Sequence, residues 1–148
     1  MSARNFIDTN ILVYANDSSD PEKQLAAKRL ILECMRNETA AISVQVLGEF
    51  WVTVTQKISR PLDYDTARKE IELFSLMHLE NLTWPICSNA LVIQKRFTLS
   101  YWDALIVSAA HSAGCTTIYT EDLQPGQRLL DIEIVNPFLL TSPNPVQA

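Results

Sequence analysis

Short apolar runs alternate with longer amphipathic segments along this chain, and the alternation predicts strands and helices in turn. The apolar runs that are too short for a helix predict strands at 6–8, 40–44, 116–120 and 132–135. Apolar residues recurring at steps of three and four predict helices just after residue 8 and at about 20–37, 45–57, 63–78, 88–96 and 100–113. The stretch 82–86 is expected to be a connection or a further short strand.

Alternating strands and helices are typical of a parallel sheet whose faces are covered by helices. We therefore predict an α/β fold, a three-layer α/β/α sandwich with a mainly parallel central sheet. Asp20 and Pro21 form a helix start, because an aspartate can cap the helix and proline suits its first turn. Gly114 is placed to end the helix before it. Residues 1–140 are expected to form one domain, and the proline-containing end, 141–148, to be a disordered tail.

The composition excludes several classes of protein. With 148 residues, 47% of them hydrophobic, the chain can bury a core and is not disordered. Lys and Arg number 12 against 17 Asp and Glu, and this net charge of −5 argues against a basic nucleic-acid-binding module. It does not argue against a nuclease whose acids hold a metal. No apolar run is long enough for a membrane span, and Asp8 interrupts the start before a signal-peptide core can form, so a cytoplasmic protein is expected.

Cysteine and glycine usage removes two further kinds of site. The three cysteines are far apart, with no C-x-x-C pair, so neither a disulfide framework nor a thiolate zinc site is expected. The three glycines are also scattered, and a P-loop or a dinucleotide-binding loop needs them clustered. Nucleotide cofactors bound by such loops are therefore excluded.

The most informative residues are acids that stand alone in apolar sequence. Asp8 lies within FIDTNILV, Glu49 within VLGEFWV and Asp103 within YWDALIV. A carboxylate in such surroundings loses hydration at a cost of several kcal/mol unless a partner compensates. Basic residues lie mostly on polar helix faces, so a shared divalent cation accounts for all three acids, and the strand-end pair 121–122 can supply a fourth. Ligation by oxygen alone suits Mg²⁺ or Mn²⁺.

Each of these acids also has a purely structural explanation. Asp8 can cap the helix that follows it, and Asp103, three residues after Ser100, can close a capping box. The pair 121–122 can form an ordinary solvated turn. Glu49 is predicted in mid-helix, where it caps nothing, but it shares a face with other polar residues that can simply be exposed to solvent. The metal hypothesis depends on the coincidence of all these acids.

Together the acid-containing segments resemble those of the PIN-domain ribonucleases, and among them the VapC-type toxins of bacterial and archaeal toxin–antitoxin pairs. The matching segments are F-I-D-T-N-I-L-V-Y, S-x-Q-V-L-x-E-F, S-Y-W-D-A-L-I-V and Y-T-E-D-L, in this order between Phe6 and Phe138. The resemblance implies a PIN-like nuclease domain over residues 1–140. It also implies a homodimer and a cognate antitoxin that occludes the site.

The resemblance assigns roles position by position. It implies that the catalytic residues are Asp8, Glu49, Asp103 and Asp122. Of these, it implies that the metal ligands are Asp8, Asp103 and Asp122. Asn10 and Thr120 are expected to order the site. Glu121 is the alternative to Asp122 as the inward-facing acid, and Asp122 is favoured.

The resulting hypothesis is a Mg²⁺- or Mn²⁺-dependent endoribonuclease that acts as a toxin and hydrolyses RNA with a metal-activated water. Metal ions reverse the local negative charge, which would otherwise repel the phosphodiester, and two divalent ions balance four carboxylates. Two alternatives stay open. One is a catalytically silent PIN-like scaffold that binds a partner. The other is a phosphatase with an aspartyl nucleophile at Asp8, although such enzymes usually carry a second acid two residues later, where this chain has Asn10.

Overall fold

The computed structural model describes residues 3–139 and contains one six-stranded sheet. Its strands are β1 (Arg4–Ile7), β2 (Ala40–Ser43), β3 (His78–Glu80), β4 (Cys115–Tyr119), β5 (Arg128–Leu129) and β6 (Ile132–Val135). The strand order is β3-β2-β1-β4-β6-β5. All neighbouring pairs are parallel except the last, in which β5 runs antiparallel to β6.

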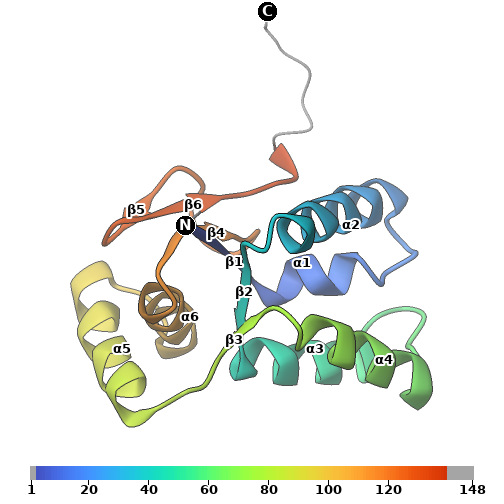
Figure 1. The fold of residues 1–148 in the computed structure, drawn as a ribbon, viewed down its shortest axis with the longest axis horizontal. Helices are drawn as coiled ribbons and strands as arrows, with labels where there is room; N and C mark the ends of the chain where they lie inside the picture. The colour runs from blue at the N-terminus through green and yellow to red at the C-terminus, as the bar shows by residue number, and fades with distance from the viewer. Residues whose placement is uncertain (1–2, 140–148) are drawn as a thin grey trace, which may run out of the picture.

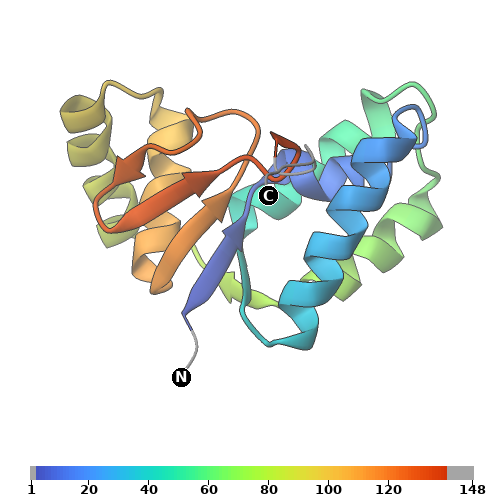
Figure 2. The ribbon, with the colours of Figure 1, turned by 90° about the horizontal axis from the view of Figure 1, so that it is seen from above.

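Six helices cover the two faces of this sheet within the described part of the chain. They are α1 (Thr9–Tyr14), α2 (Pro21–Arg36), α3 (Val44–Gln56), α4 (Tyr64–Phe74), α5 (Trp84–Phe97) and α6 (Tyr101–Ser112). Helices α1 to α4 lie on one side of the sheet, and α5 and α6 lie on the other (Figure 1). The view from above shows the same separation (Figure 2). The expected α/β/α sandwich with a mainly parallel sheet is confirmed.

The central strands carry apolar residues on both faces because helices cover both faces. Phe6 and Ile7 of β1 are fully buried, as are Ile42 of β2 and Ile118 of β4. On the α1–α4 side, the Phe50 ring of α3 meets the ring of Phe74 edge-on, with centroids 5.2 Å apart, and this contact joins α3 to α4. Burial of the strand side chains thus fixes the sheet between its two helical layers.

The chain order places a topological switch point between β1 and β4. From β1 the chain builds outward through β2 to β3, and then returns to the other side of β1 as β4. The carboxyl ends of β1 and β4 are adjacent, because Ile7 pairs with Tyr119. In parallel α/β sheets this is where ligands bind. The residues that follow these two strands, Asp8 and Thr120, therefore meet at the expected position of a site.

Some predicted boundaries were wrong, and the short elements explain why. The helix expected over 63–78 ends at Phe74, and β3 follows it. The stretch 82–86 is not a strand: α5 begins at Trp84, with Pro85 in its first turn, where no backbone donor is needed. The two-residue strand β5 was not predicted. Strands as short as β3 and β5 are defined by their pairing partners, β2 and β6, and carry little pattern of their own.

No helix between residues 3 and 139 is long and apolar enough to cross a membrane. The tail expected over 141–148 lies outside the described residues.

Candidate functional site

Asp8 lies directly after β1 and caps α1. Its Oδ1 accepts a hydrogen bond from the backbone N–H of Thr9 (2.7 Å), and its Oδ2 accepts one from the hydroxyl of Thr120 (2.8 Å). Only 6% of the residue is exposed. Asp8 therefore both caps α1 and lies at the carboxyl end of β1.

The hydroxyl of Thr120 connects three residues at this position. It donates to Asp8 and accepts from the side-chain amide of Asn10 (3.3 Å) and from the backbone N–H of Asp122 (3.0 Å). Thr120 is fully buried. A donor and two acceptor positions are thus all used, which fixes the orientation of this hydroxyl.

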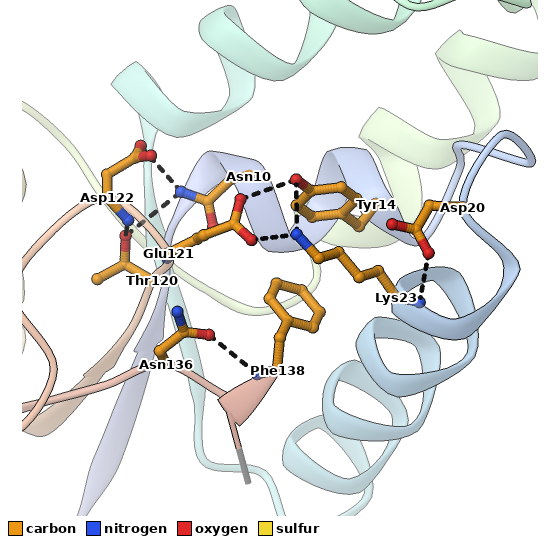
Figure 3. Close-up of polar contacts among 9 residues, drawn as sticks. All are labelled: Asn10, Tyr14, Asp20, Lys23, Thr120, Glu121, Asp122, Asn136 and Phe138. Carbon is orange, nitrogen blue, oxygen red and sulfur yellow. Dashed lines mark hydrogen bonds and ion pairs between the residues drawn. The ribbon is translucent and has the colours of Figure 1, made fainter. Parts of the chain in front are cut away.

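Asn10 joins the first turn of α1 to the turn that follows β4. Its Oδ1 accepts from the backbone N–H of Glu121 (3.2 Å), and its Nδ2 donates to Oδ2 of Asp122 (2.9 Å). The carboxylate of Asp122 therefore faces Asn10, while the backbone N–H of Asp122 faces the Thr120 hydroxyl (Figure 3). Asn10 and Thr120, which were expected to order the site, thus contact Asp8 and Asp122.

Glu121, by contrast, turns away from these acids. Its Oε1 accepts from the hydroxyl of Tyr14 (2.7 Å), and its Oε2 pairs with the ammonium group of Lys23 (Figure 3). Of the two adjacent acids, Asp122 is the one whose carboxylate contacts Asn10.

Glu49 reaches the site from α3, and neutral donors hold both of its carboxylate oxygens. Oε1 accepts from the Thr9 hydroxyl (2.7 Å) and Oε2 from the side-chain amide of Gln45 (3.2 Å). The same Gln45 amide donates to the backbone carbonyl of Trp102 (3.3 Å), the residue before Asp103. Gln45 thereby connects α3 to the start of α6.

Sequence reasoning missed Thr9 and Gln45 as residues of the site. Gln45 lies four residues before Glu49, so the two share a helix face, but a polar face of this kind can equally be an ordinary solvent-exposed face. Thr9 follows Asp8 directly, and nothing in the sequence shows that its hydroxyl meets an acid 40 residues away. Helical spacing is therefore the only sequence signal that points to either residue.

Asp103 lies in the first turn of α6, as expected. Its backbone N–H donates to the hydroxyl of Ser100 (3.1 Å), the N-cap of this helix. Burial raises the pKa of the Asp103 carboxyl, and the negative charges of Asp122 and Glu49 raise it further. These electrostatic interactions place Asp103 in the same cluster as the other acids.

Asp8 has the most strongly shifted carboxyl of this cluster. Burial raises its pKa from 3.8 to about 6, against the lowering effect of the hydrogen bonds from Thr120 and Thr9. Repulsion by Asp122 and Glu49 adds to the rise. Within residues 3–139, no Lys, Arg or His forms an ion pair with Asp8, Glu49, Asp103 or Asp122. We call these four residues the acid cluster.

The acid cluster has the donor chemistry of a Mg²⁺ or Mn²⁺ site. All its donors are carboxylate oxygens, which hard divalent cations prefer, and its negative charge has no cationic partner among the described residues. Yet nowhere in residues 3–139 do three His, Cys, Asp or Glu side chains converge into a formed metal cage. The donor type and charge fit such a cation, whereas the ligand positions are not preassembled.

A cleft opens beside the acid cluster, between α1 and α3. Its volume is about 710 Å³, and Asn10, Glu49 and Asp122 contribute to its lining. Lys57, at the end of α3, also lines it. A ligand in this cleft would thus touch two acids of the cluster and one cation.

The chain has a parallel α/β fold with carboxylates gathered at its switch point. This is the arrangement that the resemblance to PIN-domain proteins implied. The family model described as the PIN domain matches residues 6–128. This chain belongs to the PIN-domain family. No curated protein matches its sequence.

Solved structures similar to this chain include a toxin and complexes of toxin–antitoxin systems. The chain is similar to a toxin–antitoxin complex from Klebsiella pneumoniae, with a TM-score of 0.68, 20% identity and coverage of 92% of this chain and 98% of the other. It is also similar to VapC20 of Mycobacterium tuberculosis, described as a sarcin–ricin loop cleaving toxin, with a TM-score of 0.64, 21% identity and coverage of 80% and 89%. A third similar structure is VapBC2 of Rickettsia felis, bound to a promoter DNA fragment. Its TM-score is 0.63 at 18% identity, and the match covers 88% of this chain and 96% of the other. Because the identities are this low, the structural similarity establishes the fold alone.

Proposed function

We propose that this protein is a Mg²⁺- or Mn²⁺-dependent endoribonuclease that serves as the toxin of a toxin–antitoxin pair. The observation that carries the proposal is the acid cluster, whose carboxylates lie without cationic partners at the switch point of a PIN domain. Ribonucleases are typical of this family, and a structural neighbour of this chain is described as a toxin that cleaves the sarcin–ricin loop. RNA is the substrate class that this set of observations favours.

In this proposal Asp8, Asp103 and Asp122 hold the metal. When bound, Mg²⁺ or Mn²⁺ supplies Lewis acidity, which offsets the phosphate charge and makes water a better nucleophile at neutral pH. The unshielded carboxylates alone would repel a phosphodiester. Burial raises the pKa of Asp8 and of Asp103, and the negative charges of the neighbouring acids raise it further. A bound cation would offset both costs of keeping these carboxylates ionised.

The chain's own residues orient this acid cluster. Thr120 fixes Asp8, and Asn10 fixes Asp122, each by a hydrogen bond to the carboxylate. Glu49 lines the cleft, and its two oxygens are held by Thr9 and Gln45. We assign Glu49 the role of accepting the proton of the attacking water, because it lines the cleft and is the acid of the cluster that this proposal does not use as a metal ligand.

The decisive experiment is cleavage of structured and unstructured RNA by the purified protein in Mg²⁺, Mn²⁺ or EDTA. We expect cleavage in either metal and none in EDTA. The double variant Asp8→Asn, Asp103→Asn should lose activity. A matched control is Asp65→Asn, Glu72→Gln, which removes the same number of carboxylates from the exposed face of α4. Full activity of the first double variant would refute the site, and an inactive wild-type protein would favour the PIN-like scaffold.

The proposal includes a cognate antitoxin and a homodimer. Two of the structural neighbours were crystallised as toxin–antitoxin complexes. We expect expression of this chain to arrest growth, and co-expression of its antitoxin to restore it. Light scattering should give about twice the mass of one 16.7 kDa chain. Arrest by the Asp8→Asn, Asp103→Asn variant would show that toxicity does not require the acid cluster.

The aspartyl phosphatase is the weaker alternative. The position two residues after Asp8 is Asn10, and its amide is occupied by Asp122 and by the turn after β4. No second acid is thus available there to protonate a leaving group. Trapping of a phosphorylated Asp8 with a phosphoryl donor would reverse this conclusion.

A further inference from the structure

Two adjacent acids, Glu121 and Asp122, follow β4, and only one of them joins the acid cluster. A carboxylate at position 121 turned towards the cluster would be a fifth negative charge in a place where the other acids already repel one another. Other contacts must therefore hold the Glu121 carboxylate away from the acid cluster. The contacts that do so come from α1 and α2 (Figure 3).

Lys23 provides the strongest of these contacts. Its ammonium group pairs with Oε2 of Glu121 and lies 3.3 Å from the hydroxyl oxygen of Tyr14. About two-thirds of each side chain is shielded from water, since the exposed fractions are 32% for Lys23 and 27% for Glu121. The pair is therefore screened less by water and salt than an exposed pair would be.

Two aromatic rings confine the Lys23 ammonium group. It lies 4.7 Å from the ring centroid of Tyr14 and 5.2 Å from that of Phe138, and these rings meet edge-on with centroids 5.0 Å apart. A cation over aromatic faces is attracted to them. The position of the cation is also tied to the start of α2, because Asp20 caps the helix by accepting from the Lys23 backbone N–H (3.2 Å).

The position of Glu121 is transmitted to the acid cluster through Asn10. The backbone N–H of Glu121 donates to Oδ1 of Asn10, and the other end of the same amide donates to Asp122. A shift of residue 121 would turn the Asn10 amide and release the Asp122 carboxylate. The two hydrogen bonds thus form a direct connection between the ion pair and the cluster.

We infer that Lys23 is a positioning residue of the acid cluster: by pairing with Glu121 outside the cluster, it fixes the turn after β4 so that Asp122 faces Asn10. Lys23 contacts none of the acids of the cluster and does not itself line the cleft, although its partner Tyr14 does. Its effect on catalysis rests on the proposed function, whereas its effect on Asn10 and Asp122 does not.

The test is the variant Lys23→Met, which removes the cation and keeps a long apolar stem beside the rings. The first readout is NMR of the ¹⁵N-labelled full chain in EDTA, following the side-chain NH₂ signals of Asn10. We expect them to shift and broaden in Lys23→Met as the bond to Asp122 is lost, and to stay in place in the conservative Lys23→Arg. Arg68→Met, which breaks the exposed ion pair with Glu72 on α4, is the control.

The second readout is binding of Mn²⁺ alone. Changes in residues that orient metal ligands typically weaken binding by 10- to 100-fold, so we expect Lys23→Met to bind Mn²⁺ about tenfold more weakly than the wild type. Glu121→Gln removes the charge of the pair while keeping an acceptor for Tyr14, and should displace the Asn10 signals in the same direction. Glu121→Gln replaces Lys23→Met as the test variant if Lys23→Met does not fold.

The outcomes separate this inference from the proposed function. Unchanged Asn10 signals and Mn²⁺ affinity in Lys23→Met, with only a lower stability, would show that Lys23 is merely structural and overturn the inference. Displaced Asn10 signals, in a protein whose wild type cleaves no RNA, would support the positioning role and refute the nuclease.

Discussion

The hydroxyl of Thr120 lies between Asp8 and Asp122, donating to the carboxylate of the first (2.8 Å) and accepting from the backbone N–H of the second (3.0 Å). One side chain thus links the end of β1 to the turn after β4. Because Thr120 and Asp8 are both buried, bulk water cannot replace the hydrogen bond between them. The stability of this part of the protein and the arrangement of the acids depend on the same group.

We predict that Thr120→Val lowers the free energy of unfolding by about 1–3 kcal/mol, the usual cost of leaving buried polar partners unsatisfied. Valine has nearly the same shape, so packing is preserved and the loss reports the hydrogen bonds. Urea denaturation at neutral pH measures it. Thr120→Ser keeps the hydroxyl and is the control. A loss in Thr120→Ser with none in Thr120→Val would show that the methyl group, and not the hydroxyl, matters.

The raised pKa of Asp8 predicts how stability depends on pH. Between its ordinary value of 3.8 and about 6, the folded state binds a proton at Asp8 more tightly than the unfolded state does. This carboxyl therefore makes the folded protein less stable as the pH rises through that window, and its full cost is present above pH 6. Asp8→Asn removes the cost, and so should gain stability relative to the wild type as the pH rises.

We expect the difference in unfolding free energy between Asp8→Asn and the wild type to grow by up to about 3 kcal/mol from pH 4 to pH 7.5. Urea denaturation in EDTA at several pH values measures it. Asp65→Asn is the matched control, because the Asp65 side chain is exposed to solvent in both the folded and the unfolded state. A difference that shrinks as the pH rises would mean that Asp8 is stabilised as an anion in the fold.

A divalent cation should stabilise the folded protein by relieving repulsion within the acid cluster. A ligand at 100 times its dissociation constant adds about 2.7 kcal/mol to stability, so we expect Mn²⁺ to raise the melting temperature well above that in EDTA. Differential scanning fluorimetry measures this shift. The shift should vanish in Asp8→Asn, Asp103→Asn and persist in Asp65→Asn, Glu72→Gln. Equal shifts in both double variants would place the cation elsewhere.

The hydroxyl of Thr9 should matter for activity more than for folding. It holds one oxygen of Glu49, which is exposed, so its loss costs little stability. We predict that Thr9→Val lowers the rate of RNA cleavage at saturating Mn²⁺ by about tenfold. Thr55→Val is the control, because it removes a hydroxyl that bonds only the backbone of α3. An unchanged cleavage rate in Thr9→Val would show that the Thr9 hydroxyl does not contribute to catalysis.

The sequence by itself predicted the layered parallel fold and singled out the acids that form the acid cluster. It could do so because burial imposes local patterns: apolar strands, helical spacing, and caps such as Asp20 and Ser100. An acid surrounded by apolar neighbours, such as Asp8, is conspicuous for the same reason. These signals lie within a few residues of one another and need no partner from elsewhere in the chain.

Only the tertiary structure decided how those acids are held. Lys23 and Tyr14 place Glu121 outside the cluster, and the sequence separation between Lys23 and Glu121 is 98 residues. The contact between Thr9 and Glu49, and the pairing that creates the short strand β3, are likewise made by elements distant in sequence. A hydrogen bond acts over about 3 Å, so its partner is determined by how the elements pack and not by the residues beside it.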